Sequence, residues 1–101
     1  MNNYIKKAKE IVLNFINKDK ITVFLFGSRA DGTYRSDSDI DIGFLSNEKI
    51  DNSLFGKIRY ALEESIAPYH FDLVDFSKTD NELKKIANKQ IIIWNKSKNF
   101  K

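Results

Sequence analysis

Residues 21–45 read ITVFLFGSRADGTYRSDSDIDIGFL, and this stretch decides the fold. It opens with a run of β-branched, aromatic and leucine residues that stops at Gly27, which predicts a buried strand over 21–26. A polar, turn-rich segment follows from Ser28 to Ser38, and the apolar run 40–45 predicts a second strand. The stretch is therefore predicted to form two strands joined by a polar loop.

Amphipathic and apolar segments flank these two strands. Apolar residues recur at helical spacing over 3–18, 51–66 and 79–89, so each of these ranges is predicted to be a helix. A third strand is predicted over 70–76, and the apolar run 91–94 is either a last strand or a buried helical tail. This order of elements predicts an α/β (α+β) fold in which helices pack against a central sheet.

Length and composition limit the fold to one small domain. A chain of 101 residues fits a single domain over 1–101. It has no cysteine, which excludes disulfides and thiolate metal sites and suits a reducing cytoplasm. No apolar run approaches the length of a membrane span, and the first residues form no signal-peptide core. We therefore expect a cytoplasmic protein with no membrane partner.

The charge pattern bears on nucleic-acid binding. The net charge is +3 and the isoelectric point is about 9.1, which is a reason to consider a nucleic-acid partner. Much of the excess positive charge comes from lysines near the two ends, whereas the middle of the chain is acidic. Lysines on solvated helix faces explain this pattern. Direct nucleic-acid binding therefore ranks last among the candidate functions.

Gly27 and Ser28 end the first predicted strand in a way that suits phosphate. Glycine lets a ligand approach the backbone closely, and Ser28 supplies a hydroxyl group. If residues 28–31 begin a helical turn, its free N–H groups favour phosphate, and Arg29 adds charge-assisted donors. A strand-ending turn with a helix cap would use the same residues. Tyr34, in the loop that follows, is a candidate anchor for that loop.

Three aspartates are candidate metal ligands. Asp39 and Asp41 lie two residues apart, so on a strand both carboxylates project to one face while Ile40 points into the core. Paired carboxylates are tolerated when a cation lies between them, and oxygen ligands suit magnesium. Asp72 lies inside an apolar strand, where a charge is costly unless it is paired or metal-bound. It completes an acidic triad if the third strand lies beside the second, although a buried structural carboxylate is the alternative.

The pattern Gly-Ser, ten residues, then Asp-x-Asp resembles the signature of the DNA polymerase β-like nucleotidyltransferase superfamily. Residues 26–44, the strand around Asp72 and the ending Ile86…Ile91-Ile92-Ile93-Trp94 resemble the minimal nucleotidyltransferases, which are often antitoxins paired with a helical HEPN toxin. This resemblance implies a small nucleotidyltransferase fold with a mixed central sheet.

The resemblance also implies roles for the candidate residues. Gly27 and Ser28 would hold the β- and γ-phosphates of ATP, with Arg29 assisting. Asp39 and Asp41 would ligate two magnesium ions. Asp72 would bind the catalytic ion and could take the acceptor proton. The three aspartates are thus the expected catalytic residues and metal ligands.

The implied reaction is magnesium-dependent transfer of AMP from ATP to a hydroxyl group, a tyrosine of the HEPN toxin. The chain is too short to hold an acceptor domain, so the acceptor is expected on the partner. Many relatives read Gly-Ser-Arg-Ala-Arg-Gly, but Asp31 stands here in place of the second arginine and removes a positive charge near the phosphates. The alternative function is a catalytically weak antitoxin that neutralises its toxin by binding alone.

Overall fold

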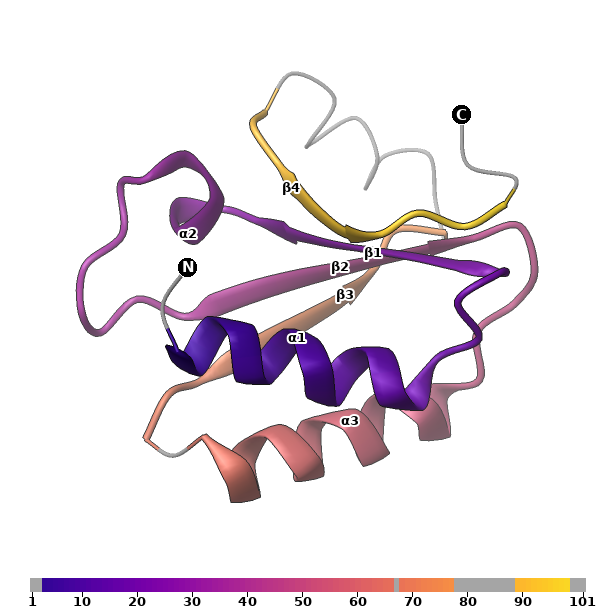
Figure 1. The fold of residues 1–101 in the computed structure, drawn as a ribbon, viewed down its shortest axis with the longest axis horizontal. Helices are drawn as coiled ribbons and strands as arrows, with labels where there is room; N and C mark the ends of the chain where they lie inside the picture. Colours follow the sequence, from indigo (N-terminus) through magenta and orange to yellow (C-terminus); the bar gives the residue numbers. More distant parts are fainter. Residues whose placement is uncertain (1–2, 67, 78–88, 99–101) are drawn as a thin grey trace.

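The elements of the fold follow the predicted order. The computed structural model describes residues 3–66, 68–77 and 89–98 (Figure 1). The predicted helix 79–89 lies outside the described residues except for Lys89. The elements are α1 (Asn3–Phe15), β1 (Ile21–Phe26), α2 (Ser28–Asp31), β2 (Ile40–Ser46), α3 (Asn52–Ser65), β3 (Phe71–Asp75) and β4 (Ile92–Asn95).

The described strands form one mixed sheet in the order β3-β2-β1-β4. β1 pairs antiparallel with both β2 and β4, whereas β2 and β3 are parallel and are connected through α3. Parallel neighbours need such a crossover connection, usually a helix. Because β4 pairs with β1, the run 91–94 belongs to a strand at the edge of the described sheet and not to a helical tail. The expected α+β fold with a mixed sheet is confirmed.

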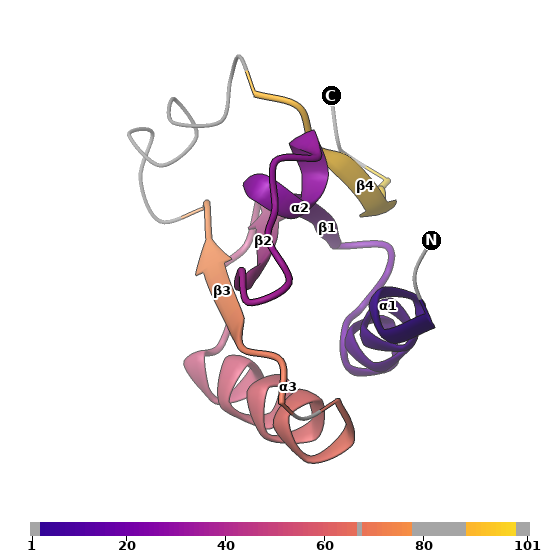
Figure 2. The same ribbon diagram turned by 90° about the vertical axis from the view of Figure 1, so that its left-hand side faces the viewer.

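Helices α1 and α3 lie on the same face of the sheet (Figure 2). Burying a large apolar side chain contributes about 1.5–3 kcal/mol, so this layer is the main source of stability. Alternate residues of β1 and β2 point into it, as strand geometry requires. The fully or almost fully buried side chains of this core include Ala8, Val12, Val23, Leu25, Ile40, Ile42, Phe44, Ile58 and Leu62.

A second, aromatic cluster lies on the opposite face of the sheet. The ring of Phe76 is 5.3 Å from that of Phe24 and 5.1 Å from that of Phe26, in tilted and edge-on arrangements. A Cβ atom at Gly43 would overlap the rings of Phe24 and Phe76, so only glycine fits between them. Because Phe26 pairs with Asp41 across β1 and β2, this aromatic face is also the face of the acidic residues.

The ends of the two long helices have local causes. α1 ends at Phe15, before the predicted residue 18, and is followed by a turn in which the carbonyl of Asn17 accepts hydrogen bonds from the N–H groups of Lys20 and Ile21. α3 begins after Asp51, whose side chain accepts from the Ser53 N–H group at 2.9 Å. This is the N-cap arrangement that favours helix initiation. In the described part of the chain, no helix has both the length and the apolar character that a membrane span requires.

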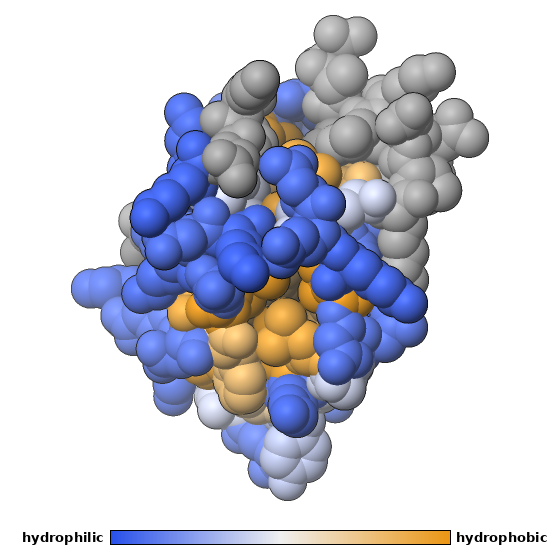
Figure 3. Space-filling view, turned by 90° about the vertical axis from the view of Figure 1, so that its right-hand side faces the viewer, coloured by the Kyte–Doolittle hydropathy of each residue, from blue (hydrophilic) through white to orange (hydrophobic). Residues whose placement is uncertain are grey.

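Apolar side chains also reach the surface at the end of the molecule where α1 ends and α3 begins. Figure 3 shows them as an apolar area surrounded by hydrophilic residues. Phe15 on α1 is 39% exposed. Apolar atoms make up much of an ordinary protein surface, so this area defines no site by itself.

Candidate functional site

Gly27 joins β1 to α2 in a conformation that favours glycine. Its backbone angles are φ 71° and ψ −155°, and a positive φ is strained for residues that carry a side chain. A Cβ atom at this position would also overlap the carboxylate of Asp41. Gly27 is therefore required twice, once for the turn and once for the close approach of an acidic side chain.

The residues after Gly27 form the helical turn that the sequence predicted over 28–31. The N–H groups of Ala30 and Asp31 donate to the Gly27 carbonyl at 3.0 and 3.2 Å. Gly32 ends the turn with φ 86°, and its N–H group donates to the Ser28 carbonyl at 3.0 Å. The first N–H groups of a helix have no partner within the helix. The N–H groups of Ser28 and Arg29 therefore have no partner within this turn, and they follow directly after Gly27, which lies against Asp41.

The strand register brings two of the predicted aspartates side by side. Asp41 is the second residue of β2 and pairs with Phe26 of β1 on one side and with Asp72 of β3 on the other. Asp39 comes just before β2. Asp41 is half-buried, whereas Asp39 and Asp72 are exposed. The expectation that β3 lies beside β2 is confirmed, and the register places Asp72 next to Asp41.

The exposure of Asp72 corrects part of the sequence argument. The apolar strand around it suggested a desolvated charge and left a buried structural carboxylate as the alternative. β3 is instead at the edge of the described sheet, and Asp72 points to the face opposite α1 and α3, where water reaches it. The alternative of a buried structural carboxylate is therefore wrong.

The carboxylates influence one another electrostatically. Burial, and then the charges of Asp72 and Asp39, raise the pKa of Asp41 to about 6. Both causes disfavour a negative charge at Asp41. A divalent cation at this position would reverse the effect, because it favours the ionised form of nearby carboxylates. The local charge therefore fits a cation-binding role.

The acidic group does not form a ready-made coordination sphere. Within residues 3–66, 68–77 and 89–98, no three histidine or acidic side chains are close enough together to hold a metal ion. Ionised carboxylates repel one another, which keeps such a group apart unless a cation lies between them. The donor type still fits, since Asp39, Asp41 and Asp72 offer the hard oxygen ligands that magnesium prefers.

The environment of the Arg29 side chain was not predicted from the sequence. It is only 7% exposed. Its Nη1 donates to the Tyr4 hydroxyl at 2.5 Å, and its Nη2 donates to the Ser38 carbonyl at 3.0 Å. Its guanidinium carbon lies 4.4 Å from the centre of the Tyr34 ring, so Tyr34 does contact the turn as a loop anchor would. A direct contact between Arg29 and phosphate stays a prediction.

Asp31 is used within its own turn. It accepts hydrogen bonds from the Thr33 hydroxyl at 2.6 Å and the Thr33 N–H group at 3.0 Å. These bonds, the hydroxyl first, hold its pKa below the ordinary value, and the charge of Lys89 adds a smaller effect in the same direction. A positive charge is therefore present near this end of α2, although it comes from the segment before β4.

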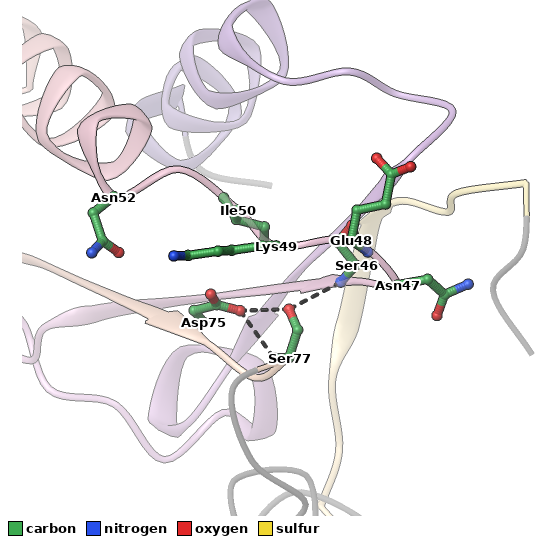
Figure 4. Close-up of a pocket in the computed structure, with 8 residues that line it drawn as sticks. All are labelled: Ser46, Asn47, Glu48, Lys49, Ile50, Asn52, Asp75 and Ser77. Carbon is green, nitrogen blue, oxygen red and sulfur yellow. Dashed lines mark hydrogen bonds between the residues drawn. The ribbon is translucent and has the colours of Figure 1, made fainter.

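A pocket of about 490 Å³ lies away from these residues. It is at the opposite ends of β2 and β3, next to the start of α3 (Figure 4). Ser77 donates to Asp75 there and accepts from the Ser46 N–H group. No predicted site residue lines it. The chemistry therefore places the candidate site at the acidic end of the strands.

Comparisons with known proteins concern the family and the fold. A family model described as polymerase beta nucleotidyltransferase matches residues 5–99. The probable protein adenylyltransferase MntA of Haemophilus influenzae is 33% identical over 72 residues, which cover 71% of this chain and 63% of that protein. The chain thus matches less than two thirds of the length of this relative.

Solved structures share the fold. A crystal structure described as a toxin–antitoxin with AMP-PNP aligns with a TM-score of 0.70 and 26% identity, over 92% of this chain and 73% of that chain. A complex of tri-AMPylated HEPN toxin with MNT antitoxin from Shewanella oneidensis aligns with a TM-score of 0.57 and 20% identity, over 88% of this chain and 70% of that chain. At 20% identity, the second match concerns the fold alone.

Proposed function

The chain belongs to the polymerase β nucleotidyltransferase family, and on that premise we propose that it transfers AMP from ATP to a hydroxyl group of a partner protein. The reaction requires divalent magnesium. One observation carries this proposal: the register of β1, β2 and β3 sets Asp41 against the Gly27 turn and beside Asp72. The Gly27 turn, to which we assign phosphate binding, thus lies beside a pair of carboxylates at one end of the sheet.

Gly27, Ser28 and the three aspartates each receive a role in this proposal. Gly27 and Ser28 would hold the β- and γ-phosphates at the start of α2, a position that favours anions. Asp39 and Asp41 would ligate two magnesium ions, and Asp72 would bind the catalytic ion and accept the proton of the attacking hydroxyl. Bound magnesium would supply charge neutralisation for the triphosphate and the leaving pyrophosphate.

The proposed partner is a helical HEPN-type toxin, with a tyrosine as the acceptor. The relative from Haemophilus influenzae is described as a probable protein adenylyltransferase, and the structure aligned at 26% identity is a toxin–antitoxin that holds AMP-PNP, an analogue of ATP. These descriptions support a protein acceptor, an antitoxin role and ATP as the donor. Absence of cysteine suits the reducing cytoplasm, where we propose that the pair acts.

A calorimetric titration tests the site. The protein is titrated with manganese or magnesium in the presence of a non-hydrolysable ATP analogue. We expect Asp39→Asn and Asp41→Asn each to weaken metal-dependent binding by about tenfold or more, because each removes a charged ligand. Asp37→Asn in the same exposed loop is the matched control and should bind as the wild type does. Unchanged binding in both site variants would place the site elsewhere.

A second candidate function is neutralisation of the toxin by binding alone. Asp31 at the position of a frequent arginine favours it, because a positive charge that would face phosphate is replaced by a negative one. The two functions differ in one measurement. A binding-only antitoxin forms a tight, inactive complex with its toxin while the mass of the toxin stays unchanged in the presence of ATP and magnesium.

A further inference from the structure

We propose that Arg29 is a positioning residue that fixes Asp39 through the backbone of the loop before it, and not through contact with the nucleotide. The inference deepens the proposed function and rests on it for the role of Asp39. It starts from a buried cation at the centre of contacts between segments that are distant in sequence. These contacts come from α1, from the loop over 32–39 and from the turn before β3.

The key contact is the hydrogen bond from Arg29 Nη2 to the Ser38 carbonyl, at 3.0 Å. That carbonyl belongs to the peptide that joins Ser38 to Asp39. On the other side of Asp39, the N–H group of Ile40 donates to the His70 carbonyl at 2.9 Å. The peptide before Asp39 is thus held by the guanidinium, and the peptide after it is held by the His70 carbonyl, just before β3. This limits the directions in which the Asp39 side chain can point.

The guanidinium is itself fixed by three tyrosines. Tyr4 accepts from Nη1, and the rings of Tyr34, Tyr4 and Tyr69 lie 4.4, 5.5 and 5.8 Å from the guanidinium carbon. Cations are attracted to such ring faces, more strongly when they are shielded from water. The Tyr4 and Tyr69 rings stack on each other at 4.0 Å with an angle of 11° between their planes. The cage therefore connects the start of α1 and the turn before β3 to the loop.

The position of Arg29 argues against a direct role at the phosphates. Its side chain is buried, and its two terminal nitrogens already donate to Tyr4 and Ser38. A contact with phosphate would require the guanidinium to leave these two acceptors and the three tyrosine rings around it. Lysine could keep the charge but has no planar fork with which to bridge the two acceptors.

The test uses two variants that alter the same bond network from different ends. Arg29→Lys removes the fork, and Tyr4→Phe removes the hydroxyl that accepts from Nη1 while keeping the stacked ring. Matched controls are Arg35→Lys, an exposed arginine of the same loop, and Tyr60→Phe, a tyrosine on α3 that is 68% exposed. Hydrogen exchange of residues 32–40 is measured in the absence of metal and nucleotide. Calorimetry then measures manganese and analogue binding.

We expect both test variants to speed hydrogen exchange in residues 32–40 by about tenfold, with no change in α3 and none in the controls. We also expect both to weaken manganese binding in the presence of the analogue by about tenfold, while analogue binding without metal stays as in the wild type. A mere packing role of Arg29 would not separate metal affinity from metal-free analogue affinity in this way.

Unchanged exchange in both variants would overturn the inference, whatever the binding data show. Faster exchange with unchanged manganese affinity would reject the link to Asp39. Weaker metal-free analogue binding in Arg29→Lys but not in Tyr4→Phe would indicate direct phosphate contact instead. If the wild type binds neither manganese nor analogue, the proposed function fails, and the exchange data still decide whether the cage holds the loop.

Discussion

At the scale of single residues, the site depends on Gly27, where no side chain fits, and on Asp41, where a carboxylate is partly buried. Gly27 combines a positive φ with direct contact to the Asp41 carboxylate. Asp41 is the only one of the three predicted ligands that is half-buried, and its pKa of about 6 shows that the site disfavours its charge. Each property gives a prediction with its own control.

Gly27→Ala should destabilise the protein and abolish metal-dependent analogue binding. The positive φ alone costs on the order of 1–3 kcal/mol for a residue with a side chain, and the overlap with Asp41 adds to it. Gly32→Ala separates the two causes, because φ is 86° there and a Cβ would meet nothing within 4 Å. Urea denaturation should show a larger loss for Gly27→Ala than for Gly32→Ala. Equal losses would mean that contact with Asp41 is unimportant.

Asp41→Asn should raise the stability of the metal-free protein at pH 7 and leave it unchanged below about pH 4. The folded-state pKa of Asp41, about 6, is above its unfolded value of 3.8, so protonation favours the folded state. The stabilisation from protonated Asp41 is fully present below pH 3.8 and is lost as the pH rises through about 6. Because the group is half-exposed, the gain at pH 7 is on the order of 1 kcal/mol. Denaturation curves at both pH values measure it, and a variant that is less stable at pH 7 would contradict the assignment.

At the scale of elements, the strands were the most predictable part. The run 21–26 matches β1 because a β-branched, aromatic segment bounded by glycine has few other folded states, and the two-residue period put Asp41 on the correct face. The helix ends differ by up to three residues, and α1 gives way to the turn at Asn17 although apolar spacing continues to Ile16. The run 91–94 has no period of its own, so only pairing with β1 decided its state.

The capping of α3 gives a prediction at this scale. Asp51→Ala should lower the melting temperature at pH 7, because the Ser53 N–H group loses its acceptor. Hydrogen bonds from Ser53 hold the pKa of Asp51 below its ordinary value of 3.8. Its stabilising effect is therefore present above that value and is lost as the pH falls below it.

Asp51→Asn keeps an acceptor oxygen and is the matched variant. It should retain most of the melting temperature at pH 7 and show less dependence on acid. Thermal melts of the three proteins at pH 7 and pH 3 provide the comparison. A melting temperature of Asp51→Ala equal to that of the wild type at pH 7 would show that the cap is dispensable.

At the scale of the whole molecule, the site combines local and distant residues, and this explains which parts the sequence revealed. Gly27, Ser28, Asp39 and Asp41 belong to one antiparallel strand pair and its connection, so a short sequence motif identified them. Asp72 required the prediction that β3 lies beside β2. The tyrosine cage around Arg29 was missed, because Tyr4 is 25 residues away from Arg29 and no local pattern marks a buried arginine.

The proposed transfer also belongs to this scale, since it needs a second protein. Asp72→Asn should slow AMP addition to the co-expressed partner by about a hundredfold or more, because loss of a metal ligand and proton acceptor costs several kcal/mol in the transition state. Intact-mass spectrometry of the partner counts whole AMP additions. Asp75→Asn, on the same strand but with its side chain bonded to Ser77, is the control. Equal additions with wild type and Asp72→Asn would remove Asp72 from the mechanism.

The antiparallel pairing of β1 with β2 has a consequence for how relatives of this chain are found. The separation between Gly27 and Asp41 is set by the strand pair, in which Phe26 lies opposite Asp41, and not by the number of residues between them. The intervening loop can therefore change in length only where the turn over 35–38 is kept, in which the Ser38 N–H group donates to the Arg35 carbonyl at 3.1 Å and the Arg35 N–H group donates to the Ser38 hydroxyl at 2.8 Å. A database search that demands a fixed gap of ten residues would miss such homologues, whereas one that aligns the two strands would recover them.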